Sequence, residues 1–294
     1  MKKLANTIKR VGLIGNSEKA LARSVITQAA RLIARTGRTV HCDAATAQLA
    51  GLKSHVHPDA KSLTAAVDLI LVFGGDGTML RVASEVAGSL TPILGINIGG
   101  LGFLTAVSSE EMPQALRRVW KGEFTLEPRA LIEVTGRCNG RLVHKCALND
   151  FVVSRGIDSR LITLEVSVDG ESLTRYRCDG LIVSSPTGST AYALSAGGAV
   201  VHPQAEVFEL TPICPHTLSN RSVIVSLKSR IQVKVISSKP ETILSADGEG
   251  ISELTAEDTV TIHRSRDSIR LIRLAGSSFF DTLRRKLHWN GTNV

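Results

Sequence analysis

Short apolar runs and longer stretches of helical spacing alternate along the first 124 residues of the chain. The apolar runs predict strands at residues 11–15, 39–42, 67–73 and 91–98. Helical spacing follows a cap at Ser17 and recurs over 78–87 and 110–120. The run at 67–73 is apolar almost throughout, which is typical of a strand buried on both faces of a parallel sheet. This order of elements predicts an α/β domain.

The pattern changes after residue 124, where alternating apolar and polar positions replace most of the helical spacing. The dipeptides Asn139-Gly140, Asp169-Gly170 and Asp247-Gly248 favour tight hairpin turns between antiparallel strands. Alternation is clear over 161–168, 231–236 and 260–263, with one helical interruption at 189–197. These features predict an antiparallel β domain.

The change of pattern also predicts the domain limits. We expect a first domain over 1–124 and an antiparallel β domain over 125–274. Helical spacing returns in the tail, 275–294, which we expect to pack back on the first domain.

Composition narrows the class of protein. The chain has 294 residues, 43% hydrophobic and 21% charged, which is typical of a folded globular protein with room for two domains. The formal net charge of +8 favours anionic partners such as nucleic acid, membrane surfaces or phosphorylated small molecules. The apolar runs are too short for a membrane span, and the first residues lack the apolar core of a secretory signal. We therefore expect a cytoplasmic protein.

Neither metal binding nor nucleic-acid binding is predicted. The five cysteines and eight histidines lack the spacing of metal sites, and the scattered cysteines form no disulfide framework. The stretch 264–273 alternates arginines with aliphatic residues, which we interpret as the solvated side of an edge strand. Only 4% of residues are aromatic, so a basic surface with stacking side chains is not expected.

The segment Gly74-Gly75-Asp76-Gly77-Thr78 follows the buried strand and precedes a helix. Glycines at such a turn allow backbone N–H groups to face an anion, although an ordinary strand-to-helix turn is the alternative interpretation. A carboxylate repels phosphate, so Asp76 is a candidate general base rather than a phosphate ligand. A P-loop, a nucleophile elbow and a dinucleotide fingerprint are all absent from the sequence.

A run of small hydroxyl residues from Asp179 to Tyr192 is the densest motif of the second half. Ser and Thr side chains there can cap a helix and bind a polar ligand, while Tyr192 offers an aromatic face. The pair Asn149-Asp150 is interpreted as a strand-end turn and Asp247-Gly248 as a hairpin tip unless other residues place them at a site.

Taken in order, these motifs resemble those of the bacterial-type NAD kinases. The matching segments are Gly74 to Thr78, Gly95-Ile96-Asn97 with 101–104, Asn149-Asp150, Asp179 to Tyr192 with 195–198, 212–218 and 280–289. The first motif is shared with diacylglycerol and sphingosine kinases, whereas the run from Pro186 to Tyr192 resembles only the NAD kinases.

The resemblance implies the NAD kinase and diacylglycerol kinase-like fold, in which an α/β domain is followed by a β-sandwich and the active site lies in the cleft between them. It implies transfer of the γ-phosphoryl group of ATP, bound with Mg²⁺ or another divalent cation, to the 2′-hydroxyl of the adenosine ribose of NAD. By analogy, Asp76 accepts the hydroxyl proton, and Gly75 and Gly77 face phosphates. The implied assembly is a homodimer or homotetramer that binds neither nucleic acid nor a membrane.

The resemblance also implies contacts with the adenosine half of the substrate. Asn149 and Asp150 correspond to positions that bind the adenosine, and Phe103 and Thr190 to positions beside the adenine. The family usually has Glu where Asp150 stands. The shorter side chain loses one methylene of reach toward a ribose hydroxyl, so the hydrogen bond is expected to be longer or bridged by water.

The remaining positions belong to the nicotinamide half and its surroundings. The residues that match the nicotinamide-binding positions are Asp179, Ala191, Tyr192 and Ser195. Arg177 matches a position linked to preference for NAD over NADH, and Thr187 and Asp247 complete the predicted binding set. A lipid kinase with the shared glycine motif is the alternative function. The choice between ATP and polyphosphate as donor, and the use of NADH, stay open.

Overall fold

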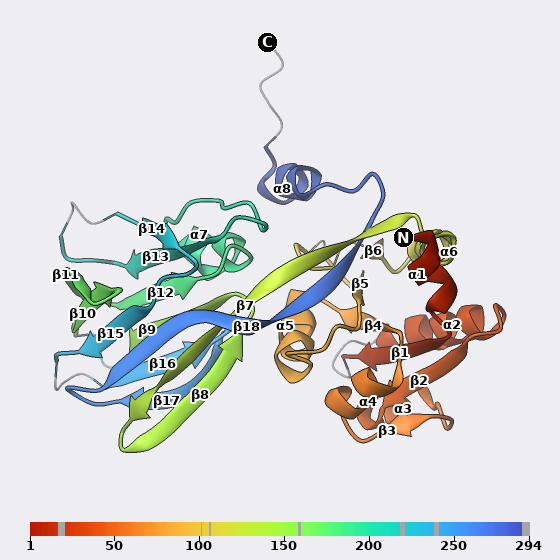
Figure 1. Cartoon of the computed structure of the whole chain (residues 1–294), viewed down its shortest axis with the longest axis horizontal. Helices are drawn as coiled ribbons and strands as arrows, with labels where there is room; N and C mark the ends of the chain where they lie inside the picture. Colours follow the sequence, from red (N-terminus) through yellow and green to blue (C-terminus); the bar gives the residue numbers. More distant parts are fainter. Residues whose placement is uncertain are drawn as a thin grey trace, which may run out of the picture. The chain divides into compact units, whose positions relative to one another are not determined.

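The computed structural model describes residues 1–16, 21–100, 102–105, 107–157, 160–217, 221–237 and 241–289. The chain forms two compact units, one of residues 1–128 with 268–294 and one of residues 129–267 (Figure 1). These limits differ by a few residues from the predicted limits at 124 and 274. Two long strands cross the limits between the units. β7 (Phe124–Cys138) crosses the limit after residue 128, and β18 (Thr259–Leu274) crosses the limit after residue 267. The predicted cap at Ser17 lies outside the described residues.

The first unit is built on a parallel sheet. Its strands are β1 (Arg10–Gly15), β2 (Thr39–Asp43), β3 (Val56–His57), β4 (Leu69–Gly74), β5 (Ile93–Asn97) and β6 (Val107–Ser108). The order is β18-β5-β4-β1-β2-β3, with β6 also paired to β5. The predicted central strand is confirmed, because β4 lies between β1 and β5 and is buried along its whole length.

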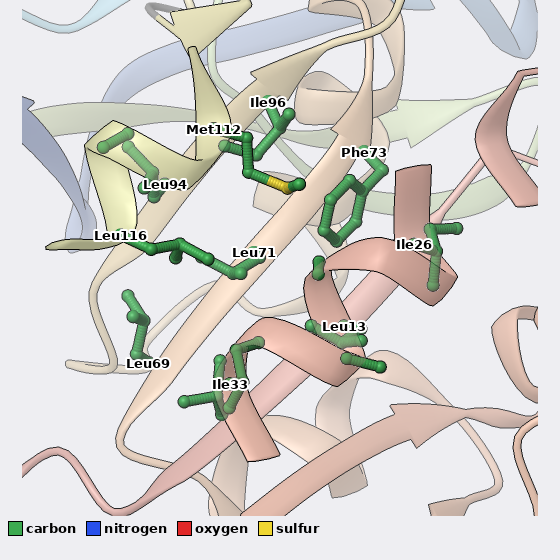
Figure 2. Packing of buried hydrophobic residues seen from close by; sticks show 14 of the residues in the cluster. Leu13, Ile26, Ile33, Leu69, Leu71, Phe73, Leu94, Ile96, Met112 and Leu116 are labelled. Carbon is green, nitrogen blue, oxygen red and sulfur yellow. The ribbon is translucent and has the colours of Figure 1, made fainter. Parts of the chain in front are cut away.

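Helices cover both faces of this sheet. They are α1 (Lys2–Thr7), α2 (Ala22–Ala34), α3 (Ala44–Ala50), α4 (Ala60–Ala66), α5 (Asp76–Glu85) and α6 (Met112–Lys121). The unit also contains α8 (Phe279–Leu287), which follows β18. Figure 2 shows Phe73 and Leu71 of β4 packed with Ile26 of α2 and Met112 of α6 on one face. On the other face, Leu63 of α4 contacts the backbone at Gly12. The α/β prediction for this region is therefore confirmed.

Three of these helices, α1, α3 and α4, were not predicted, although α3 and α4 each carry a recognisable start signal. The carboxylate of Asp43 accepts a hydrogen bond from the Thr46 N–H at 2.9 Å at the start of α3. Asp59 does the same for the Ser62 N–H at 2.7 Å at the start of α4. An Asp before a short apolar stretch is a typical N-cap, but both helices are only seven residues long and show little periodicity.

The second unit is a sandwich of two sheets with antiparallel ladders. Its further strands are β8 (Arg141–Ala147), β9 (Asp150–Arg155), β10 (Ile162–Val168), β11 (Glu171–Cys178), β12 (Gly180–Ser184), β13 (Val207–Ile213), β14 (Val223–Ser226), β15 (Ile231–Val235), β16 (Thr242–Ala246) and β17 (Glu249–Leu254). One sheet has the order β11-β10-β15-β18, with β7 paired to β18 and β8 paired to β7, and the other has the order β14-β13-β12-β9-β16-β17. Alternate residues of both sheets, such as Val134 and Phe151, form one buried core. The predicted β-sandwich is confirmed.

All three predicted hairpin turns are present. The two central residues have positive φ in each turn, as in Asn139 (46°) and Gly140 (77°). Asp247 (49°) and Gly248 (86°) have the same conformation between β16 and β17. Positive φ at both positions defines the type I′ turn that these dipeptides favour.

The edge-strand interpretation of 264–273 is contradicted at Leu271, which pairs with β5, while β18 also pairs with β7. β15 pairs with β18 only at Thr259 to Ile262, before this stretch. The alternation of exposed and buried residues does not show where along a strand a second partner pairs.

The predicted helical interruption near 189–197 consists of a short 3₁₀ segment, η1 (Gly188–Thr190), and the single-turn helix α7 (Tyr192–Ser195). Ala193 of α7 packs on Val152 and Ile182, which lie on the outer face of the second sheet. Among the helices of the described ranges, none has the length and apolar character needed to span a membrane.

Candidate functional site

Asp76 stands at the carboxyl end of the buried strand β4 and is the first residue of α5. Its carboxylate accepts backbone N–H bonds from Phe103 at 2.8 Å and from Leu104 at 3.0 Å, one on each oxygen. The Thr105 hydroxyl is a further donor at 3.4 Å. A carboxylate has about four acceptor positions, so these bonds fix its orientation and leave acceptor capacity free. The side chain is half-buried.

A second strand end supports the segment that holds Asp76. Asn97, at the end of β5, is paired in register with Gly74 at the end of β4. The Asn97 side-chain amide donates to the Gly100 carbonyl at 2.6 Å and to the Thr105 hydroxyl at 2.8 Å. The carboxyl ends of adjacent parallel strands thus meet at one edge, which is where ligands bind in open α/β sheets.

Close backbone approaches require glycine at two positions around Asp76. A Cβ on Gly102 would overlap Asp76 Oδ1 and Thr105 Oγ1. A Cβ on Gly74 would overlap the Thr78 hydroxyl. The motif at 101–104 includes Gly102, but it does not predict that this glycine packs against the Asp76 carboxylate.

Gly75 and Gly77 differ from these two glycines. A Cβ on either residue would meet no atom within 4 Å, and neither has positive φ. The fold of this chain therefore does not itself require glycine there. The missing side chains leave open space beside Asp76 at the start of α5, where backbone N–H groups and the helix dipole favour an anion.

Phe103 lies beside helix α8. Its ring centroid is 6.4 Å from that of Phe279, and Lys286 Nζ lies 5.6 Å from the Phe103 centroid. α8 therefore places an aromatic ring and a cation next to a residue assigned to the adenine pocket. The sequence pattern predicted that the tail packs on the first domain, but not that Phe279 and Lys286 lie beside Phe103.

In the second unit, Asp247 organises the Asn149-Asp150 segment. Its carboxylate accepts N–H bonds from Leu148 at 2.9 Å, Asn149 at 2.8 Å and Asp150 at 3.2 Å. In return, the Asp247 N–H donates to the Asp150 carbonyl at 3.0 Å. Asp247 is both the hairpin tip that its dipeptide predicts and a direct partner of the predicted adenosine-binding segment.

The hydroxyl run is attached to the same segment. The Ser185 N–H donates to the Asn149 carbonyl at 2.8 Å, and the Ser185 hydroxyl donates to the Leu148 carbonyl at 2.6 Å. The Ser185 oxygen in turn accepts N–H bonds from Thr187 at 3.1 Å and Gly188 at 3.2 Å. The structure therefore brings Asn149, Asp150, Thr187 and Asp247 together, although up to 98 residues separate the hydrogen-bonded partners.

Asp150 is buried, with 4% of its surface exposed. Burial, with a smaller contribution from the nearby Asp247 carboxylate, raises the pKa of Asp150 to about 7. Burial also raises the pKa of Asp247. Near neutral pH, the Asp150 carboxyl is therefore partly protonated and is able to donate as well as accept a hydrogen bond.

Asp150→Asn is expected to change how stability depends on pH. Because the folded-state pKa of about 7 lies above the ordinary value of 3.8, the folded state binds this proton more tightly than the unfolded state. The contribution of Asp150 to the free energy of unfolding should fall as pH rises from about 4 to about 7, by about 4 kcal/mol in all, and then level off.

Urea unfolding of the parent and of Asp150→Asn at pH 5, 6, 7 and 8 measures this change. The variant should gain stability relative to the parent as pH rises, whereas Asp267→Asn, at an exposed carboxylate, should follow the parent. Parallel pH profiles for Asp150→Asn and the parent would contradict the prediction.

Asp179 and Arg177 lie at the other end of β12 from the Ser185 segment. Roughly 20 Å of extended strand separates Asp179 from Ser185. Asp179 accepts a hydrogen bond from Arg155 Nε at 2.8 Å, and the Arg177 carbonyl accepts one from the His216 N–H at 2.8 Å. The two ends of the segment from Asp179 to Tyr192 therefore do not form one compact cluster within a single chain.

The remaining predicted residues lie along the outer face of the sheet that contains β9 and β12. Ala191, Tyr192 and Ser195 belong to or adjoin α7, and 48% of the Tyr192 surface is exposed. The Thr190 hydroxyl donates to the Thr187 carbonyl at 3.4 Å. These positions lie between the Asn149 and Asp179 ends because Ala193 packs over the middle of β9 and β12.

Two supporting residues were not predicted from the sequence. Arg129 donates from Nη1 to the Thr187 hydroxyl at 3.4 Å. Glu209 is buried and accepts the N–H of Ala199, which fixes the backbone just after α7. A buried charged residue in a strand is the available signal in both cases, but it appears only once the strands are placed.

The sequence matches two family models. The model described as the ATP-NAD kinase N-terminal domain matches residues 11–124, and the model described as the ATP-NAD kinase C-terminal domain matches residues 148–274. An NAD kinase of Polaromonas naphthalenivorans (strain CJ2) is 38% identical over 288 residues, 98% of this chain and 99% of that protein. An NAD kinase of Symbiobacterium thermophilum is 41% identical over 279 residues, 95% of this chain and 98% of that protein.

Solved structures of an NADH kinase and an NAD kinase also align with nearly the whole of this chain. Yeast NADH kinase complexed with NADH aligns with a TM-score of 0.88 and 25% identity, over 98% of this chain and 90% of that one. An NAD kinase from Archaeoglobus fulgidus in complex with ATP aligns with a TM-score of 0.73 and 28% identity, over 96% of this chain and 100% of that one.

Proposed function

This chain belongs to the ATP-NAD kinase family, and from that premise we propose that it transfers the γ-phosphoryl group of ATP to the 2′-hydroxyl of the adenosine ribose of NAD. The product is NADP. The observation that carries the proposal is the fixed carboxylate of Asp76 beside two glycines whose missing side chains leave open space.

Asp76 is proposed as the general base. Two backbone N–H bonds hold its carboxylate at the edge of the parallel sheet, so that it is oriented before substrate arrives. Phosphoryl transfer requires mainly positioning and charge neutralisation, so a carboxylate of ordinary basicity suffices to accept the hydroxyl proton. Gly75 and Gly77 face the phosphates.

Mg²⁺ fits the donors of this site. Asp76 supplies carboxylate oxygens beside the open glycine positions, and Mg²⁺ in proteins is usually held by one or two carboxylates together with substrate phosphates. We therefore propose that the ion would be bound mainly through ATP oxygens, and that Asp76 is the protein carboxylate that would help to hold it. When bound, it neutralises charge on the transferred phosphoryl group.

The residues of the second unit are proposed to bind NAD. Asn149 and Asp150 hold the adenosine, and their support by Asp247 explains why a hairpin tip belongs to the binding set. Thr190 and, from the first unit, Phe103 are assigned to the adenine. The nicotinamide half is assigned to Asp179, Ala191, Tyr192 and Ser195, with Arg177 favouring NAD over NADH.

We further propose that the active form is a homodimer or homotetramer in the cytoplasm, where NAD and ATP are available. The comparisons give no support to a lipid kinase, which is the alternative function that shares the glycine motif.

Incubation of the purified full chain with NAD, ATP and Mg²⁺ tests the function. NADP, detected with an NADP-specific dehydrogenase, should accumulate only when all components are present. Parallel reactions with polyphosphate and with NADH define the donor and acceptor, and diacylglycerol in micelles tests the alternative. Lack of NADP with both ATP and polyphosphate, or phosphorylation of the lipid instead, would overturn the proposal.

A further inference from the structure

A cluster of metal-ligating side chains lies in the second unit, and none of its members belongs to the proposed substrate site. Glu133 comes from β7, His144 and Cys146 from β8, and His263 from β18. Glu133 is paired in register with Cys146, and His144 is two residues before Cys146, so all three point to the same face of the sheet. That face is opposite to the sandwich core, which receives Ile132, Val134 and Ala147.

The ligand atoms of three of these residues converge. His144 Nε2 lies 3.1 Å from Glu133 Oε2. One ligand atom each of Glu133, His144 and Cys146 lies within 4.8 Å of the other two. In a tetrahedral zinc site, ligand atoms at about 2.0–2.3 Å from the ion are about 3.3–3.6 Å from one another. Because the three ligand atoms lie within 4.8 Å of one another, side-chain rotations that move them by about 1 Å would give this geometry.

His263 supports the cluster from the neighbouring strand. Its Nδ1 lies 3.2 Å from Glu133 Oε1 and 3.0 Å from the Arg264 carbonyl oxygen. Both neighbours are acceptors, so Nδ1 carries the hydrogen. The other carboxylate oxygen of Glu133 is then left to face His144. A ligating carboxylate that is oriented by a hydrogen-bond donor is a recurrent arrangement of metal sites.

We propose that Glu133, His144 and Cys146 bind a zinc-type divalent transition-metal ion, with His263 as a positioning residue for Glu133. A thiolate, an imidazole and a carboxylate favour such an ion over Mg²⁺ or Ca²⁺, which prefer oxygen ligands alone. The fourth position is open to water, because 67% of the His144 side chain is exposed. The ion joins β8 to β7 and does not enter phosphoryl transfer.

Spacing along the chain predicts no metal site, and the reason is visible in the sheet. His144 and Cys146 are only two residues apart, a separation that brings ligands together on one face of a strand but does not form a recognisable motif. The other members come from strands 11 and 119 residues away, so only the pairing of β7, β8 and β18 collects them.

Cobalt spectroscopy of the full chain tests the proposal. Protein stripped of metal with a chelator is titrated with Co²⁺, which reports a bound thiolate by a sulfur-to-cobalt charge-transfer absorption. One equivalent should bind, Zn²⁺ should displace it, and a large excess of Mg²⁺ should not. The melting temperature of the stripped protein should rise on addition of Zn²⁺.

Variants separate this site from adventitious binding. Cys146→Ser should abolish the charge-transfer band, and His144→Ala and His263→Ala should each weaken Co²⁺ binding by at least about tenfold. Cys214→Ser, at an exposed cysteine, should bind as the parent does. If Cys146→Ser does not fold, His144→Ala tests the proposal instead, because the exposed His144 side chain contributes little to packing. A titration without a thiolate band, or a band that His144→Ala leaves at parental affinity, would overturn the proposal.

Discussion

Asp76→Asn is expected to lower kcat for NADP formation by about 10²- to 10⁴-fold, because the variant lacks the group that accepts the proton of the attacking hydroxyl. Binding of NAD should be weakened far less than kcat, since Asn149, Asp150 and the nicotinamide-half residues lie on other segments and only Phe103 is bonded to Asp76. Steady-state kinetics with NAD and ATP, together with NAD binding measured by calorimetry, checks both parts. A variant with unchanged kcat would remove Asp76 from the role of base.

The structure adds a necessary control to this experiment. Each Asp76 oxygen accepts a different backbone N–H, from Phe103 and Leu104. An Asn amide accepts only one of them and turns its own N–H₂ toward the other, so the variant also disturbs the segment 102–105. Thr105→Val keeps the carboxylate but removes one donor to Asp76 and one acceptor of the Asn97 amide. Its loss of kcat should stay within about tenfold, because Asp76 loses only the long bond and keeps both backbone N–H bonds.

Gly102→Ala is expected to reduce kcat by about 100-fold, although it leaves Asp76 itself unchanged. The new Cβ would overlap Asp76 Oδ1 and Thr105 Oγ1, so the carboxylate must move away from its present position. A displacement of about 1 Å in a reacting group typically costs a factor of that size. Comparison of kcat for parent and variant measures the effect, and a crystal structure of the variant would show the displaced carboxylate.

Gly100→Ala is the matched control for this prediction. It lies two residues away, its φ is not positive, and a Cβ there meets no atom within 4 Å. Its kcat and melting temperature should stay close to those of the parent. If Gly102→Ala folds and works at the parental rate, the contact with Gly102 is not what holds the carboxylate in place.

Local pattern predicted most of the elements for physical reasons that are themselves local. The apolar run of β4, the dipeptides of the three hairpins and the change from helical to alternating spacing after residue 124 each depend on interactions between near neighbours. The short helices α3 and α4 were not predicted, because seven residues show too little periodicity and tertiary packing stabilises such short helices.

For the candidate site, the sequence identified most of the chemical groups but not their supports. Asp76 and Asp150 stand in motifs that the sequence shows directly. The N–H donors that orient Asp76 come from residues 27 and 28 positions away, and Asp247 reaches the Asn149 segment across 98 positions. Such pairings depend on which strand ends adjoin, and spacing along the chain does not encode that.

The sequence by itself therefore determined the α/β and β-sandwich classes, the hairpin turns and the family, because these follow from local spacing and from motifs in a fixed order. Only the tertiary structure decided that β18 pairs with β15 near one end and with β5 near the other, that Gly102 packs against the Asp76 carboxylate, and that burial beside Asp247 raises the pKa of Asp150. It also collected Glu133, His144 and Cys146 from two strands. Each of these results depends on contacts between distant segments, and those contacts form only when sheets and helices pack.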